Sequence, residues 1–266
     1  MRTFTLATAL ALIVLAGTGQ AQAASGSYKL CSTGPGNAIV SPGKRGKCAH
    51  GQHALALARA AQVSSLKRRV GALEATLAGV SRSGQTLRLS GLNLQIVSGS
   101  GSTSGPVNGR GNLIIGCGER RAGDQQTGSH NLVLGVNQSF TTYGGVVGGY
   151  ENKLDGRYAA VFGIFNTASG PASTVAGGQT NTATGFASAV AGGNHNTASG
   201  DESAVAGGET NTASGLKSAV AGGDTNTAGG LYSAVAGGEG NTASGVASLA
   251  RGGQDYYLSA DYGYVP

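Results

Sequence analysis

The sequence predicts a mainly β protein: a parallel β-roll solenoid of 15-residue repeats, preceded by a short coiled-coil helix and a small Cys-bounded N-terminal module. Three observations predict it. Residues 166–255 repeat one 15-residue phrase, residues 63–80 carry a heptad pattern, and the 266 residues include 49 Gly but only 11% charged and 5% aromatic residues. Globular domains carry roughly 25% charged residues. The chain lacks the large side chains of a compact enzyme core, yet its recurrent Val, Ile and Leu argue against plain disorder.

Residues 1–23, "MRTFTLATALALIVLAGTGQAQA", resemble a secretory signal peptide. Arg2 supplies the positive start, Leu6 to Ala16 the apolar stretch, and Ala21-Gln22-Ala23 a small-x-small cleavage site. The apolar run is shorter than the roughly 20 residues that span a membrane. We therefore expect cleavage before Ala24, a secreted or cell-surface protein, and no transmembrane segment in the mature chain.

Charge is divided along the chain. Residues 1–121 hold 14 Lys and Arg against two acidic residues, a balance of +12, whereas residues 122–266 hold 4 basic and 10 acidic residues, a balance of −6. Export argues against nucleic acid as a partner. An anionic envelope polymer is one partner for the basic half, and a solvated basic face is the alternative. The basic residues that would dock on such a polymer are Lys44, Arg45, Lys47, Lys67, Arg68 and Arg69.

Residues 24–55 are expected to form a small module of two or three short strands. In an exported chain, Cys31 and Cys48 most simply form a disulfide around "SPGKRGK". The same cysteines with His50 and His53 could also bind zinc, but their spacing matches no standard zinc finger. Cys117 is left over, as a buried thiol or as a site of intermolecular pairing.

Residues 56–82 are predicted to form a short coiled-coil helix, because six apolar residues follow a heptad seam. The seam consists of Val63, Leu66, Val70, Leu73, Leu77 and Val80. Val at one seam position and Leu at the other favours two strands over three. An amphipathic helix packed on its own domain is the alternative.

The region before the repeats has two parts. Residues 83–111 are expected to contain a strand pair, broken at Ser90-Gly91, and a Gly/Ser linker at 98–105. Residues 112–165 are expected to form irregular β-roll turns, since "NLIIG", "NLVLG", "GVVGG" and "AVFGI" are apolar units that each contain Gly.

Residues 166–255 form six regular repeats, and exact periodicity of this kind is typical of a solenoid. Each 15-residue turn offers two strands, Asn-Thr-Ala-Ser and Ser-Ala-Val-Ala, with bends at Ser-Gly and Gly-Gly. Stacking the turns at ~4.8 Å aligns equivalent residues into ladders. The Asn ladder is Asn166, Asn181, Asn196, Asn211, Asn226 and Asn241. The structural core ladder is Val175, Val190, Val205, Val220 and Val235.

A roll with such small core residues buries little apolar area. Association along the Val ladder would add burial, so the composition favours an oligomer without setting its number.

The phrases "SAVAGG" and "NTASG" resemble the head repeats of trimeric autotransporter adhesins (YadA-like). The resemblance is tight over 166–255 and loose over 112–165. It implies a left-handed parallel β-roll and a homotrimer. The chain departs from that family in three respects. Its predicted coiled coil precedes the roll instead of following it, and its repeats have Gly-Gly where the family more often has an apolar residue before a single Gly. After "DYYLSADYGYVP" we expect no C-terminal membrane anchor of that family.

The sequence contains no G-x-S-x-G, complete G-x-G-x-x-G, P-loop or H-E-x-x-H motif. Asp201 and Glu202 lie at variable positions that are expected to be solvated turns, and His195 replaces a Thr at another. Acidic residues recur only once per unit, unlike calcium-binding repeats. We therefore expect no enzyme activity, no metal and no cofactor.

Variable positions are the natural contact surface, and a Tyr-rich segment, residues 256–266, follows the last repeat. This segment is expected to cap the open end of the solenoid, and an aromatic contact patch is the alternative. The candidate contact residues are Phe186, Leu216, Tyr232, Tyr256 and Tyr257.

The functional hypothesis is an exported surface structural or adhesive module built as a trimeric β-roll, with a surface polysaccharide or host matrix as its partner. One alternative is an ice-binding solenoid that uses Thr-x-Ser ladders, such as Thr167 with Ser169 and Thr197 with Ser199. Another is a non-catalytic polysaccharide-binding fibre.

Overall fold

A computed structural model describes residues 29–32, 39–40, 48, 50, 53–56 and 60–265. The expected signal peptide and the basic residues Lys44, Arg45 and Lys47 lie outside these residues. The chain divides into two compact units, residues 1–93 and 94–266. In the part of the chain described, no helix is both long enough and apolar enough to cross a membrane.

The first unit contains a small sheet, a helix and a hairpin. Strand β1 (Lys29–Ser32) pairs antiparallel with β2 (Ile39–Val40) and with β3 (His53–Ala56). The Cys31–Cys48 disulfide is present, as predicted. A zinc site that uses these thiols is therefore excluded in this state.

Helix α1 (Ala60–Thr76) is shorter than the predicted 56–82. Leu77 lies in the turn after the helix, and Val80 belongs to strand β4, so these two residues are not on a helical seam. Gly79 is the last residue of the turn between the helix and β4; its φ is +89°, and a Cβ there would lie 2.6 Å from the carbonyl oxygen of Ser90. A glycine in this conformation commonly follows the end of a helix.

Of the two strands predicted on either side of Ser90-Gly91, only the first is present. The hairpin joins β4 (Val80–Ser83) to β5 (Thr86–Leu89), and residues 90–97 contain no strand. A two-residue loop that begins with Gly84 at a φ of +56° makes the connection. The Gly/Ser linker also differs from a free connector, because the backbone N–H of Ser98 donates to His130 Nε2 at 3.0 Å.

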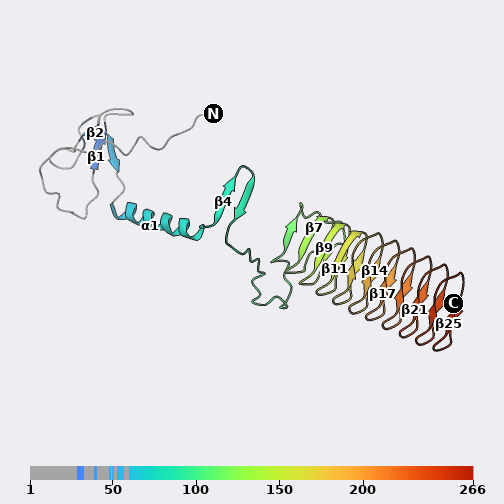
Figure 1. Ribbon diagram of the computed structural model, residues 1–266. Helices are drawn as coiled ribbons and strands as arrows, with labels where there is room; N and C mark the ends of the chain where they lie inside the picture. Colours follow the sequence, from blue (N-terminus) through green and yellow to red (C-terminus); the bar gives the residue numbers. More distant parts are fainter. Residues whose placement is uncertain are drawn as a thin grey trace. The chain divides into compact units, whose positions relative to one another are not determined.

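The second unit is a parallel β-solenoid with two sheets (Figure 1). The eleven-stranded sheet consists of β6 (Leu113–Ile115), β7 (Leu132–Val136), β9 (Val146–Tyr150), β11 (Ala160–Ile164), β13 (Thr174–Val175), β15 (Ala189–Val190), β17 (Ala204–Val205), β19 (Ala219–Val220), β21 (Ala234–Val235), β23 (Leu249–Ala250) and β25 (Tyr264–Val265). The nine-stranded sheet consists of β8 (Ser139–Phe140), β10 (Lys153–Leu154), β12 (Thr167–Ala168), β14 (Thr182–Ala183), β16 (Thr197–Ala198), β18 (Thr212–Ala213), β20 (Thr227–Ala228), β22 (Thr242–Ala243) and β24 (Tyr257–Leu258). The predicted two strands per turn and the stacking of equivalent residues are confirmed.

One extra glycine separates the regular turns from the irregular ones. Lys153 pairs with Thr167, 14 residues later, whereas Thr182 pairs with Thr197, 15 residues later. Ile164 is bridged to Gln179, so Gly177 is the residue added between Val175 and this bridge. Strand β11 runs for five residues without it, but β13 has only two. The added residue acts as a bulge, which interrupts a strand by one unpaired residue.

The interior of the roll is formed by aligned small side chains. The Val ladder is 0–1% exposed and faces an alanine ladder from the nine-stranded sheet, while Phe140 and Leu154 fill the same interior in the 14-residue turns. Residues 256–265 form one more turn, because β24 and β25 extend both sheets. The segment predicted as a cap is therefore a further turn of the solenoid, in which Leu258 packs against the core.

Candidate functional site

The Asn ladder is structural. Asn196 is buried, its Nδ2 donates to the carbonyl oxygens of Gly192 and Gly208 at 3.0 and 2.9 Å, and its Oδ1 accepts the backbone N–H of Asn211 at 2.9 Å. Each Asn thereby joins the backbone of its own bend to that of the next turn. Gln138 and Asn152 extend the ladder into the 14-residue turns, which the sequence analysis missed because the period changes there.

The Val ladder lies inside each roll and is not available for association, which corrects the expectation that copies meet along it. Within Ser203-Ala204-Val205-Ala206, the Ser and Val side chains are buried and both alanines are exposed. The eleven-stranded sheet therefore presents an outward surface of alanines, which we call the alanine face. It consists of Ala189, Ala191, Ala204, Ala206, Ala219, Ala221, Ala234 and Ala236.

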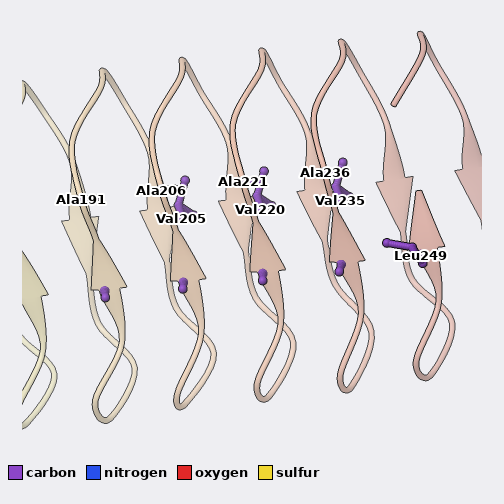
Figure 2. A pocket seen from close by; sticks show the side chains of 12 residues that line it. Ala191, Val205, Ala206, Val220, Ala221, Val235, Ala236 and Leu249 are labelled. Atoms are coloured by element: carbon purple, nitrogen blue, oxygen red, sulfur yellow. The ribbon is translucent and has the colours of Figure 1, made fainter. Parts of the chain in front are cut away.

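The alanine face contains a shallow apolar groove of about 490 Å³, lined by Ala and Val side chains and by Leu249 (Figure 2). Larger apolar side chains continue this surface toward β6: Leu113 is 40% exposed, Ile115 59% and Phe162 36%. No charged residue lines the groove. A sheet face of this kind favours contact with another apolar surface.

The opposite face carries hydroxyl groups. Outward Thr residues of the nine-stranded sheet pair in register from turn to turn, and Ser or Thr follows two residues later in most turns. We call this the hydroxyl face; it consists of Thr167, Ser169, Thr182, Thr184, Thr197, Ser199, Thr212, Ser214, Thr227, Thr242 and Ser244. Gly229 interrupts the second row.

A third surface, which we call the turn edge, is formed by the two variable residues that follow the Gly at the bend after each strand of the nine-stranded sheet. From Tyr143 to Tyr262 these residues stack turn upon turn, since the second residue of each pair donates its backbone N–H to the carbonyl of the first residue in the preceding turn. The second residue has a positive φ, for example 57° at Lys217 and 59° at Tyr232. Lys217 pairs with Glu202 at 3.6 Å and lies over the Tyr232 ring at 5.9 Å.

The five candidate contact residues do not form one patch. Phe186, Leu216 and Tyr232 lie on the turn edge and are 43–53% exposed. Tyr256 occupies the next Asn-ladder position, where its backbone N–H donates to Asn241 Oδ1, and Tyr257 extends the Thr row of the hydroxyl face. Tyr262 of the Tyr-rich segment also lies on the turn edge, and so does Tyr158, which was not predicted although counting from the ladder residue of each turn would have found it.

Other predicted features lie apart from these surfaces. Glu209, Asp224 and Glu239 stack at a second bend, and among the described residues no group of three His, Cys, Asp or Glu side chains is placed to hold a metal ion. His195 is an exposed residue of the same bend. Cys117 is exposed, so the expectation of a buried thiol is wrong.

The apolar side chains of the first unit are also exposed. On α1, Val63 is 40% exposed, Leu66 53%, Val70 50% and Leu73 62%. On the hairpin, Leu87 is 66% exposed. Exposed apolar side chains in such numbers mark a contact surface.

Neither the scan against protein-family models nor the search of curated proteins finds a match to this chain. The surfaces of the solenoid therefore carry the functional argument.

Proposed function

We propose that the chain is an exported, non-catalytic surface module, with a structural or adhesive role, that assembles as a homotrimer of left-handed β-rolls. The alanine face carries this proposal. It is continuous over several turns, flat because its side chains are small, and free of charge along its groove. Burying apolar surface of this kind contributes about 25 cal/mol per Å².

Two further observations support assembly from parallel copies. The helix seam and the hairpin expose apolar side chains in the first unit, and the alanine face does so in the second. Identical chains in parallel would cover all these surfaces by like-with-like contacts. The resemblance of the repeats to YadA-like heads supports the number three and the left-handed winding.

Light scattering on the mature protein tests the assembly. We expect the mass of three chains. The double variant Ala206→Lys/Ala221→Lys should have a lower mass and retain its circular dichroism, because both side chains point out of the roll. The matched control Ser199→Lys/Ser214→Lys changes the hydroxyl face of neighbouring turns and should keep the parent mass. A monomeric parent, or no effect of the alanine-face charges, would contradict the proposal.

The hydroxyl face favours a second candidate function, ice binding. Its Thr rows repeat at ~4.8 Å between turns, and the second hydroxyl lies ~6.6 Å along the strand, so the face is a regular two-dimensional array. Thermal hysteresis of the mature protein measures this activity. We expect Thr197→Tyr/Thr212→Tyr to abolish it, whereas absence of hysteresis in the concentrated parent protein would exclude the function.

A further inference from the structure

Exposed aromatic rings lie along the turn edge in two pairs, with three turns between Phe186 and Tyr232; Phe186 is the first residue of its bend, and the three tyrosines are the second. Tyr158, Phe186, Tyr232 and Tyr262 are 56%, 51%, 53% and 79% exposed. Tyr158 and Phe186 are two turns apart, and so are Tyr232 and Tyr262. Two turns of a parallel stack correspond to ~9.6 Å. The two pairs of rings thus share one spacing along one edge.

The backbone of the edge keeps this spacing constant. The N–H of Glu202 donates to Phe186 O at 2.7 Å, that of Tyr232 to Leu216 O at 3.0 Å, and that of Tyr262 to Val246 O at 2.7 Å. Every turn from Tyr143 onward has the equivalent bond. Because binding to a rigid surface costs little ordering entropy, the rings are preorganised for a long, straight ligand.

Three of the rings stand at positions that disfavour large side chains. Tyr158, Tyr232 and Tyr262 have φ values of 61°, 59° and 56°. Glycine adopts this conformation readily and bulky residues rarely do. Gly144 occupies the same position in an earlier turn, so the fold accepts a residue without this cost. The positive φ is a property of the bend, since Ala172, Ala187 and Ala247 share it, and the tyrosines place bulky rings at a position where smaller residues also fit.

The turn edge carries both charges: Arg157 and Lys217 are basic, and Asp201, Glu202 and Asp261 are acidic. Glu202 and Lys217 pair with each other between the two aromatic pairs, and the Asp201 and Asp261 carboxylates accept backbone N–H groups of Phe186 and Val246. The side-chain hydrogen bond with Tyr143 raises the pKa of the Tyr158 phenol above its ordinary value. The edge offers neutral rings and hydrogen-bonding groups, with no concentration of either charge.

The geometry points to an extended, neutral polysaccharide of β-1,4-linked pyranoses, lying lengthwise along the turn edge. The apolar faces of its sugars stack on the rings, and its hydroxyls bond to the Glu202 and Lys217 side chains. Two sugars of such a chain span about two turns, so within each pair the two rings meet sugars that present the same face. An α-linked chain coils and cannot follow the edge. This inference rests on the adhesive role proposed above and specifies its ligand.

Affinity electrophoresis of the mature protein in gels that contain soluble β-1,4-glucan tests the inference, with soluble α-1,4-glucan as the comparison. We expect retardation by the β-linked polymer alone. The variant Tyr158→Ala/Tyr232→Ala should bind at least about tenfold more weakly, a loss of about 1.4 kcal/mol. It should keep its fold, because Ala172, Ala187 and Ala247 occupy the same position in other turns.

The matched control is Tyr257→Ala, which removes an exposed ring from the hydroxyl face and should bind like the parent. No retardation of the parent by β-1,4-glucan, equal retardation by both polymers, or equal binding by the edge variant would overturn the inference. Light scattering on the same samples separates the two proposals: a trimer that does not bind refutes only the ligand, and a monomer that binds refutes only the assembly.

Discussion

Glycines in the repeat have two different structural roles. Gly200, at the bend of the Ser-Gly phrase, has no positive φ, yet a Cβ there would lie 2.1 Å from the carbonyl oxygen of Gly215 in the next turn. Gly207, the added residue of the Gly-Gly phrase, has no atom within 4 Å of such a Cβ. The first glycine is required by the close approach of backbones, and the second forms the bulge.

Gly200→Ala should therefore destabilise the solenoid strongly, by roughly 3 kcal/mol or more, because backbone atoms of two turns must separate. Gly207→Ala is the matched control and should change stability by less than about 1 kcal/mol. Thermal or denaturant unfolding measures both. Similar midpoints for the two variants would show that the turns do not stack as closely as described.

The Val ladder provides a second test at this scale. Val220 is 1% exposed inside the roll, so Val220→Asp buries a charge without a partner and should unfold the adjacent turns. Lys217→Asn in the same turn removes an exposed ion pair, worth at most about 1 kcal/mol, and places Asn at a positive φ that it tolerates. Circular dichroism should separate the two variants, and a fully folded Val220→Asp protein would refute the interior position.

At the scale of the element, the length of a strand depends on one residue. Strand β11 has five residues in a 14-residue turn, and β13 has two in a 15-residue turn that contains Gly177. The bulge ends the strand early and leaves backbone pairing to isolated bridges, such as that between Gln179 and Asn194. Each turn contacts its neighbours, so the turn is the unit of stability, as in other solenoids.

Deletion of residues 196–210 should remove one turn and leave a folded solenoid, because His195 would then join Asn211 in the original register. Deletion of residues 196–203 removes about half a turn and should misalign every ladder beyond it. Melting curves and hydrogen exchange distinguish the two proteins. Equal protection of residues 211–255 in both would contradict the register argument.

At the scale of the whole molecule, the basic residues are concentrated in the first unit, and the Asn and Val ladders lie in the second. Residues 1–93 hold 11 Lys and Arg against Glu74, a balance of +10, and residues 94–266 hold 7 basic and 11 acidic residues, a balance of −4. On α1, Lys67, Arg68 and Arg69 are exposed, although Lys44, Arg45 and Lys47 of the predicted docking set are not among the described residues. The two units therefore offer different chemistry: a basic first unit and a weakly acidic solenoid with uncharged faces.

Binding of the full chain to beads of an anionic envelope polymer should weaken as salt rises from about 0.1 M to about 1 M, since screening shortens to about 3 Å. Changing Lys67, Arg68 and Arg69 together to Gln should lower binding at low salt. Lys153→Gln, which removes a solenoid Lys paired with Asp155, is the control and should bind like the parent. Binding that is insensitive to salt would exclude electrostatic docking.

From its repeats alone, the sequence predicts the solenoid, its two strands per turn and its Asn and Val ladders, because an exact 15-residue period places equivalent side chains one above another. It also predicts the Cys31–Cys48 disulfide. It predicts the helix, but not its end at Thr76, since the heptad seam runs on through Gly79 into a hairpin. A local pattern cannot show where a backbone turns to meet another.

Only the tertiary structure decided which residues face outward and which rings share an edge. The side chains of Ser-Ala-Val-Ala alternate between two faces of a strand, one buried and one exposed. Only the closed turn shows that Val points inward and both alanines point outward. Tyr158 and Tyr232 are 74 positions apart in the sequence, and they lie on one edge because the backbone bonds of the bends stack every turn in register. Surfaces of this kind arise from stacking, which connects residues one or several turns apart.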